Sequence, residues 1–157
     1  TRRLVGSVRG VYETCGLTTL TTLRLYAEID VNNVPVEEVG EWVLDLSRLT
    51  TLNVLDLENC HAVKDKEVLA LSHLTGLKDL NLDYCINVSS EGLRAVSSLT
   101  ALSTLSLSCC PNVSDEVLRA LSTLTALTTL SLFSCPKVSA AAKQALRTAI
   151  PNLTIHG

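Results

Sequence analysis

Cysteine is a residue type that could do chemistry, and its spacing in this chain is regular. Of the six cysteines, four recur at an interval of 25 residues, at Cys60, Cys85, Cys110 and Cys135. Zinc sites use ligands from short spacings that converge on one point, whereas an interval of 25 residues predicts a linear column. We therefore expect these four thiols to be structural and to hydrogen-bond to the backbone of a turn.

The other nucleophiles and bases give no catalytic arrangement. Cys15 and Cys109 lie outside the regular spacing, and the neighbours Cys60 and His61 would diverge on a turn. The three histidines are far apart in the sequence, at His61, His73 and His156. The chain has no glycine-rich phosphate loop and no carboxylate pair in a plausible pocket. We expect no enzymatic activity, no catalytic residue, no metal and no cofactor.

The cysteines and the glycosylation patterns bear on the compartment. Side chains that point inward in parallel do not face one another, so we expect free thiols and a reducing compartment, the cytoplasm or the nucleus. Asn-x-Ser/Thr patterns begin at Asn87, Asn112 and Asn152. The first two coincide with turn and cap positions and are interpreted as structural, although all three become candidates if the protein is secreted.

The cysteine column is one position of a longer repeat. Four blocks, 49–73, 74–98, 99–123 and 124–148, share the pattern L-T-x-L-x-x-L-x-L-x-x-C-x-x-V-x-x-x-x-x-x-A-[LV]. A fixed period of this length indicates a solenoid, in which each unit buries its apolar face against its neighbours.

The third block shows how each unit is expected to fold. Leu105 and Leu107 alternate with polar residues, as in a strand with one buried face. Residues 110–113 then form a turn, Ser114 is placed to cap a helix, and Asp115 lies at the positive end of the helix dipole. The buried face of the helix follows at intervals of three residues, with Leu118, Leu121 and Leu124.

Repetition of a strand, a turn and a helix predicts an α/β solenoid. Successive strands are parallel, and the helices lie on the opposite side. Helices are wider than the strand spacing of about 4.8 Å, so the stack curves with the strands on the concave face. An alanine column is expected to let adjacent helices approach, at Ala70, Ala95, Ala120 and Ala145.

The turn carries a family resemblance. Residues 110–115 read Cys-Pro-Asn-Val-Ser-Asp, close to the turn pattern C-x-x-[IV]-[ST]-D. From about Leu17 to the C-terminus the chain resembles leucine-rich repeats of the cysteine-containing class, found in F-box adaptor proteins and AMN-type proteins. The resemblance implies a horseshoe-shaped arc, protein binding, and a role as the substrate-receptor part of a ubiquitin-ligase adaptor.

The ends of the chain depart from the repeat. Residues 1–16 are interpreted as an N-terminal cap or a truncated repeat, and 149–157 as a C-terminal partial repeat. The unit 17–48 is longer than the others and has Glu28 in place of the cysteine. Its extra residues form either a loop on a binding edge or an irregular end repeat.

Composition excludes several classes of partner. Hydrophobic residues make up 46% of the 157 residues but aromatic residues only 3%, so the core is aliphatic. The net charge of −3 argues against a dedicated nucleic-acid surface. The sequence has no apolar run of about 18 residues for a membrane span. We expect no small-molecule substrate.

The predicted concave face offers a surface for a protein partner. Carboxylates gather on two neighbouring strands, and aromatic residues fall on exposed positions. The candidate partner-binding residues are Arg24, Tyr26, Asp56, Glu58, Asp79, Asn81, Asp83, Tyr84, Ser106 and Phe133. Aromatic anchors with an acidic patch would select a basic segment. Alternatively, the carboxylates only keep a solvated sheet face from aggregating, and the site is the segment near Trp42 or the helical side.

These features predict a non-catalytic protein–protein interaction module. The alternative is a structural or assembly subunit of a large complex that docks through its ends or its helices.

Overall fold

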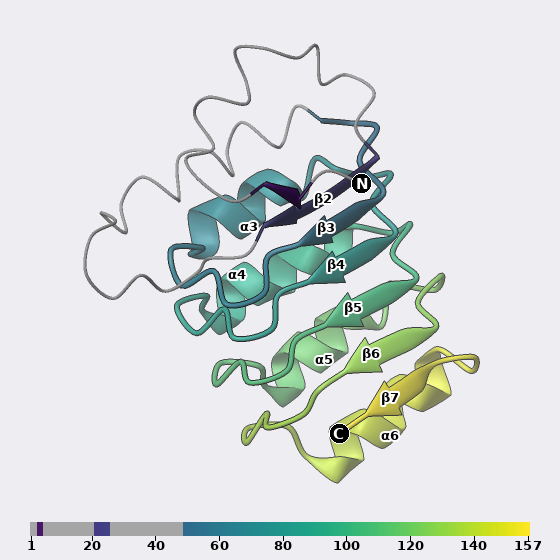
Figure 1. Cartoon of the computed structure of the whole chain (residues 1–157). Helices are drawn as coiled ribbons and strands as arrows, with labels where there is room; N and C mark the ends of the chain where they lie inside the picture. Colours follow the sequence, from purple (N-terminus) through teal and green to yellow (C-terminus); the bar gives the residue numbers. More distant parts are fainter. Residues whose placement is uncertain (1–2, 5–20, 26–48) are drawn as a thin grey trace.

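The computed structural model describes residues 3–4, 21–25 and 49–157 of the chain. In this part of the chain seven parallel strands form one sheet in sequence order (Figure 1). Their bounds are β1 Arg3–Leu4, β2 Thr22–Leu25, β3 Val54–Asp56, β4 Asp79–Asn81, β5 Thr104–Ser106, β6 Thr129–Ser131 and β7 Thr154–His156. The predicted cap, 1–16, and the predicted longer repeat, 17–48, fall mostly outside the described residues.

The helices lie on one side of this sheet (Figure 1). They are α3 Asp65–Leu71, α4 Ser90–Arg94 with the 3₁₀ helix η2 Ala95–Ser98 directly after it, α5 Asp115–Leu121 and α6 Ala140–Ala149. Consecutive helices contact each other along the stack. Of the alanines expected at these contacts, Ala70, Ala95 and Ala120 are half-buried, whereas Ala145 on the last helix is exposed.

The strand register confirms the predicted inward side of each repeat. Leu80 of β4 pairs with Leu55 of β3 and Leu105 of β5, and the row continues through Leu130 to Ile155 of β7. The four leucines are fully buried and Ile155 is 8% exposed. Burial of a leucine side chain contributes about 1.5–3 kcal/mol, so this row is a main source of stability.

A left-handed residue precedes the cysteine in each of the four regular repeats. Asn59, Tyr84, Cys109 and Ser134 have φ angles between 55° and 63°. Non-glycine residues rarely adopt this conformation, and asparagine tolerates it best. The conformation turns the chain sharply after the strand and lets the next residue, the cysteine, enter the core.

Carboxylate–serine hydrogen bonds join two pairs of neighbouring repeats. The Asp65 carboxylate accepts from the Ser89 backbone N–H at 2.7 Å and from its hydroxyl at 2.6 Å. Asp115 accepts from the same groups of Ser139, each at 2.8 Å. A Cβ at Gly92 would collide with the Asp65 carboxylate, so the absence of a side chain there lets Asp65 approach α4.

These bonds correct the predicted role of Ser114. Ser114 occupies the N-cap position of α5, but its side chain makes no capping hydrogen bond. Ser89 and Ser139 do cap their helices, and each also donates its hydroxyl to an aspartate of the preceding repeat. In the repeat that precedes Ser114, the position equivalent to Asp65 is occupied by Ser90. The Ser90 hydroxyl donates to the Asn112 carbonyl at 2.6 Å, so it does not orient Ser114 as an aspartate would.

At β7 two cations cover carbonyls of the outer strand of the sheet. Lys143 stands where the other helices have an apolar residue, and its Nζ donates to the Gly157 carbonyl at 2.8 Å. One turn later on α6, the Arg147 guanidinium donates to the Ile155 carbonyl at 3.4 Å. The lysine therefore replaces a core contact with one hydrogen bond to the residue that follows β7.

Candidate partner-binding face

The cysteine column is structural. Three thiols donate to carbonyls of the preceding repeat, Cys85 to Leu57 at 3.3 Å, Cys110 to Leu82 at 3.1 Å and Cys135 to Leu107 at 3.2 Å. Burial raises the pKa of the Cys85 and Cys135 thiols and raises the pKa of Cys110 to about 12. Protonated thiols of this kind are poor nucleophiles and poor metal ligands.

Other chemistry-bearing side chains are dispersed. The five cysteines in the described part of the chain are free thiols. Within the same residues, no three His, Cys, Asp or Glu side chains are grouped to hold a metal ion. No helix in the described ranges has the length and apolar character needed to cross a membrane. Asn87 and Asn112 each donate a side-chain N–H to a carbonyl of the preceding repeat, at 2.7 and 3.0 Å.

Two rows of residues cross the sheet on the side opposite the buried leucines. In the first row Asp79 pairs with Val54 of β3 and with Thr104 of β5, and the row continues through Thr129 to Thr154. The second row runs through the positions of Arg3, Arg24, Asp56, Asn81, Ser106, Ser131 and His156. Strand alternation places both rows on the concave face.

The carboxylates of this face are partly exposed and locally ordered. Asp56, Glu58, Asp79 and Asp83 are all half-buried. The Asp56 carboxylate accepts from the Glu58 backbone N–H at 3.2 Å. Asp83 is held by the next repeat, because its carboxylate accepts from the Ser106 hydroxyl at 2.7 Å and from the Ser108 backbone N–H. Glu58 makes no side-chain hydrogen bond or ion pair with another described residue.

Asn81 and Ser106 both hydrogen-bond to Asp83, Asn81 to its backbone N–H and Ser106 to its carboxylate. The Asn81 side-chain oxygen accepts from the Asp83 backbone N–H at 2.9 Å, which repeats the contact between Asp56 and Glu58 one strand earlier. On the next strand, Ser106 donates to Asp83. Farther along, the hydroxyls of Ser108 and Ser131 lie 2.9 Å apart.

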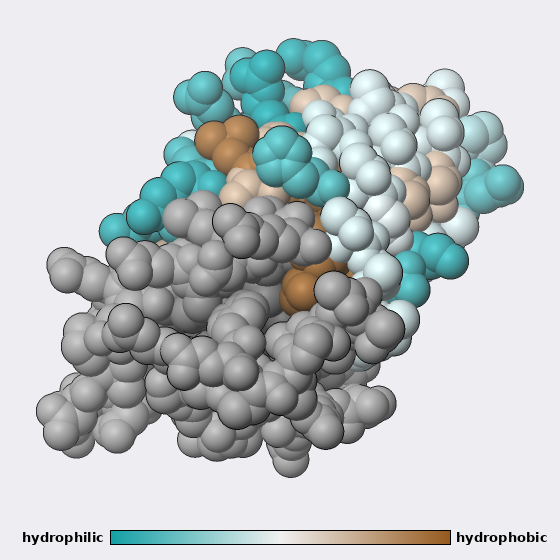
Figure 2. Space-filling view, turned by 90° about the horizontal axis from the view of Figure 1, so that it is seen from above, coloured by the Kyte–Doolittle hydropathy of each residue, from teal (hydrophilic) through white to brown (hydrophobic). Residues whose placement is uncertain are grey.

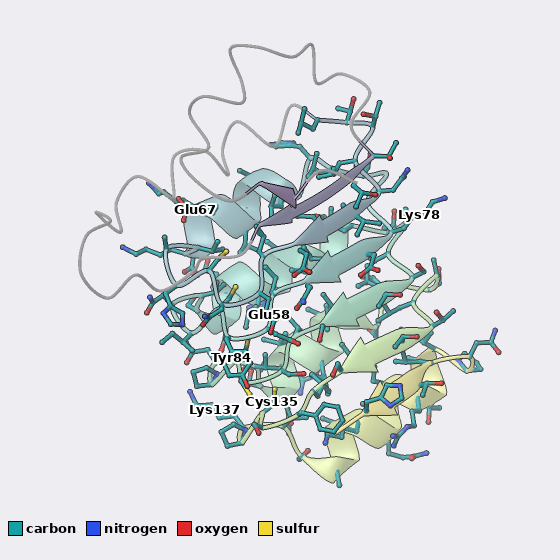
Figure 3. The ribbon with its side chains drawn as sticks, in the orientation of Figure 1. Glu58, Glu67, Lys78, Tyr84, Cys135 and Lys137 are labelled. Carbon is teal, nitrogen blue, oxygen red and sulfur yellow. The ribbon has the colours of Figure 1, made fainter. Side chains whose placement is uncertain are left out.

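Aromatic side chains are exposed at the carboxyl ends of the strands. Tyr84 is 46% exposed and Phe133 is 55% exposed. Figure 3 shows Tyr84 and Glu58 at this edge, at the opposite end of the strands from Lys78. A hydrogen bond with Cys109 is the main reason why the pKa of the Tyr84 hydroxyl is raised, and the nearby Glu58 and Asp83 carboxylates raise it further.

The structure places eight of the ten predicted residues on the outer face of β3–β5 or at the carboxyl ends of β3, β4 and β6. Arg24 occupies a register position beside Asp56 in β2, and Tyr26 lies outside the described residues. The alternative segment near Trp42 also lies outside them. Among the described helices, Leu69 of α3 is a large apolar side chain that is 53% exposed. Figure 2, which looks along the stack from the β1 end, shows apolar atoms only in small patches among the coloured residues.

The sequence interpretation missed Cys109 as a neighbour of the candidate site. Its half-buried thiol lies beside the Tyr84 hydroxyl. The available signal was the 25-residue interval itself, which places Cys109 in the same column as Tyr84 on the adjacent repeat.

Comparison with known proteins identifies the fold. No protein-family model matches this chain, and no curated protein matches it. Among solved structures, a chain of the yeast Rad7–Elc1 complex matches with a TM-score of 0.58 at 21% identity, over 74% of this chain and 29% of the matched chain. A leucine-rich-repeat protein of Leptospira interrogans matches with a TM-score of 0.57 at 22% identity, over 89% of this chain and 38% of that protein.

Two further solved structures extend the same result. An internalin of Listeria monocytogenes matches with a TM-score of 0.54 at 22% identity, over 78% of this chain and 37% of the internalin. A TLR13–ssRNA13 complex matches with a TM-score of 0.52 at 21% identity, over 88% of this chain and 19% of the matched chain. The chain spans less than half the length of each of these proteins. Its fold is a leucine-rich-repeat solenoid with parallel strands on the concave face and short helices on the convex face.

Proposed function

We propose that this solenoid is a protein-interaction module that binds a basic segment of a partner on its concave face. The observation that carries the proposal is the uneven chemistry of equivalent positions. Four carboxylates, Asp56, Glu58, Asp79 and Asp83, occupy β3, β4 and the residues just after them, whereas the equivalent positions on and after β5 are Thr104, Ser106 and Ser108.

Neighbouring strands lie about 4.8 Å apart, and side chains on one side of an extended segment recur every two residues, at about 6.6 Å. The long side chains of successive cations can therefore reach carboxylates on neighbouring strands. Charge complementarity of this kind acts mainly on partner choice and association rate.

The comparisons agree with a binding role. Rad7 was solved in a complex with Elc1, and TLR13 in a complex with a single-stranded RNA. Carboxylates on the concave face of this chain would repel phosphates, which favours a protein partner over a nucleic acid. We propose no catalytic role for the chain.

The resemblance of the turn to F-box-type repeats extends the proposal to one biological setting. In that setting the chain is the substrate-receiving part of a ubiquitin-ligase adaptor in the cytoplasm or nucleus. Its free thiols, Cys60, Cys85, Cys109, Cys110 and Cys135, suit a reducing compartment.

A charge reversal tests the proposal. The probe is a fluorescein-labelled peptide of alternating lysine and serine, followed by fluorescence polarisation, with an alternating glutamate and serine peptide and a single-stranded oligouridine as competitors. The double variant Asp56→Lys/Asp79→Lys should lose binding of the basic peptide by at least about tenfold, which is about 1.4 kcal/mol. Its melting curve should stay close to that of the parent, because both side chains are partly exposed on the outer face of the sheet.

The control adds lysines on the next two strands, both in the row of Asp79. Thr104→Lys/Thr129→Lys should weaken binding much less than the aspartate reversal. Equal loss in both variants would mean that any added positive charge suffices, and unchanged binding after the aspartate reversal would place the site elsewhere. Binding that persists at high salt would favour permanent docking as an assembly subunit, and preference for oligouridine would favour a nucleic-acid partner.

A further inference from the structure

The described residues include two aromatic side chains, Tyr84 and Phe133, and both lie on the same edge of the sheet. One is in the repeat before Ser108 and Cys109, and the other is in the repeat after them. The Tyr84 backbone N–H donates to the Ser108 carbonyl at 3.0 Å, and the Cys109 backbone N–H donates to the Phe133 carbonyl at 2.8 Å. Ser108 and Cys109 therefore lie between Tyr84 and Phe133. Both rings are about half exposed, in a chain with an otherwise aliphatic core.

Carboxylates adjoin this edge on the β3 side. Glu58 and Asp83 each lie two residues after the end of a strand, β3 and β4 respectively, and Asp83 directly precedes Tyr84. Asp83 is held in place by Ser106 and Ser108, whereas the carboxylate of Glu58 has no partner among the described residues. One carboxylate is thus preorganised and the other remains able to bind a ligand cation.

The backbone at Tyr84 has the left-handed conformation that recurs at this turn. Its φ is 59°, and Asn59, Cys109 and Ser134 have similar values at the equivalent positions. Asparagine suits this conformation better than tyrosine. In this repeat the turn carries a large, half-exposed ring.

We propose that Tyr84, Glu58, Asp83 and Phe133 form a seat for one arginine side chain of the basic segment, and we call this set the arginine seat. The inference rests on the proposed function and adds the identity and place of the anchor residue. A guanidinium can stack on the Tyr84 ring while its N–H groups reach the two carboxylates, and its aliphatic stem can cover the apolar edge toward Phe133.

Lysine fits this seat less well than arginine. An ammonium is a compact, strongly hydrated charge without a planar face, so it gains less from the ring and cannot donate in a planar fork to two carboxylates. Cation–aromatic contacts strengthen binding by about two- to fivefold at exposed sites and by about thirtyfold when desolvated. The seat therefore predicts discrimination between arginine and lysine, in addition to attraction of positive charge.

The experiment compares two labelled peptides on four proteins. One peptide alternates arginine with serine and the other alternates lysine with serine. The proteins are the parent chain, Tyr84→Asn, Glu58→Gln and the control Ile86→Asn. Tyr84→Asn copies the left-handed residue of the preceding repeat, so it should fold at least as well as the parent. Ile86 is 42% exposed on the same turn but outside the seat.

The parent should bind the arginine peptide at least about threefold more tightly than the lysine peptide. Tyr84→Asn should remove this preference and weaken the arginine peptide by about tenfold, and Glu58→Gln should weaken both peptides by a smaller factor. Ile86→Asn should change neither affinity. Circular dichroism melting curves confirm that each variant is folded.

The outcomes separate the two proposals. If both peptides bind and respond to the aspartate reversal, but Tyr84→Asn leaves the arginine preference intact, the arginine seat is wrong and the proposed function stands. If neither peptide binds the parent chain, the proposed function is wrong and the seat is wrong with it. If Tyr84→Asn lowers binding but the aspartate reversal does not, the seat stands and the broader acidic face is not the site.

Discussion

The two sides of the sheet follow different rules. Toward the helices, the central position of the strand is leucine from β3 to β6 and isoleucine in β7, and all are buried. The next residue along each strand faces away and changes from Asp56 through Asn81, Ser106 and Ser131 to His156. Packing against identical neighbours constrains the inner side, whereas the outer side is free to carry recognition chemistry.

The largest expected effect separates the two sides on one strand. Leu105→Ala should lower the free energy of unfolding by about 2–5 kcal/mol, because it leaves a cavity between two leucines of the row. Thr104→Ala, on the outer side of the same strand, is the control and should change stability by about 0.5 kcal/mol or less. Urea unfolding monitored by circular dichroism measures both, and similar losses would contradict the strand phase.

Two adjacent thiols provide the second contrast. Cys110 is buried with a pKa of about 12, so about one thiol in ten thousand is ionised at pH 8. Cys109 is half-buried at the surface turn. Brief treatment of the native protein with N-ethylmaleimide should modify Cys109 and spare Cys110, as peptide mass spectrometry can show. Labelling of both in urea is the control, and equal native labelling would mean that the turn opens readily.

Asp115 is an exception to the contrast between buried and outward residues, because its outward carboxylate stabilises the fold. Hydrogen bonds from the Ser139 backbone and hydroxyl lower the pKa of Asp115. A carboxyl whose pKa is lower in the folded state contributes stability above its unfolded pKa, and this contribution is lost as the pH falls through the folded pKa. Asp115→Asn should therefore destabilise the protein near neutral pH and approach the parent in acid.

The neighbouring residue on the same helix supplies the control for Asp115. Glu116 is exposed and has no described hydrogen-bond partner, so Glu116→Gln should follow the parent across the same pH range. A pH-independent difference between Asp115→Asn and the parent would mean that the lost interaction does not depend on the charge.

The smallest expected effect concerns the left-handed turn. Ser134→Asn places at φ 55° the residue type found at the equivalent position 59. Since asparagine is several-fold enriched in this conformation, the free energy of unfolding should rise by about 0.5–1 kcal/mol. The control Ser134→Ala should be neutral or destabilising. A gain from alanine equal to that from asparagine would exclude backbone strain as the reason.

The repeat made the inner half of the structure predictable. A fixed period with alternating leucines determines strand phase, parallel order and burial together, because a shift of one residue would expose the whole row. The thiol column followed for the same reason. Its donors, Cys85, Cys110 and Cys135, each reach a carbonyl of the preceding repeat.

Contacts between outward residues of different repeats were not predictable in the same way. Ser114 occupies a capping position in the sequence, yet its side chain does not cap the helix. The serines that do cap are oriented by an aspartate of the preceding repeat, as Ser89 is by Asp65. The contact of Tyr84 with Cys109 depends on a left-handed turn that contains no glycine. No residue type at this position indicates that conformation from the sequence. The placement of Tyr26 and Trp42 stays a prediction.

The two cations of α6 have a consequence for the assembly behaviour of this sheet. An open outer strand offers its carbonyls to any chain that can pair with it, and this is a common route to fibres. With Lys143 and Arg147 bonded to Gly157 and Ile155, an incoming strand must first displace two charged donors. Packing of a further repeat against α6 would therefore be helped by leucine at position 143, the residue type found at the equivalent positions 93 and 118.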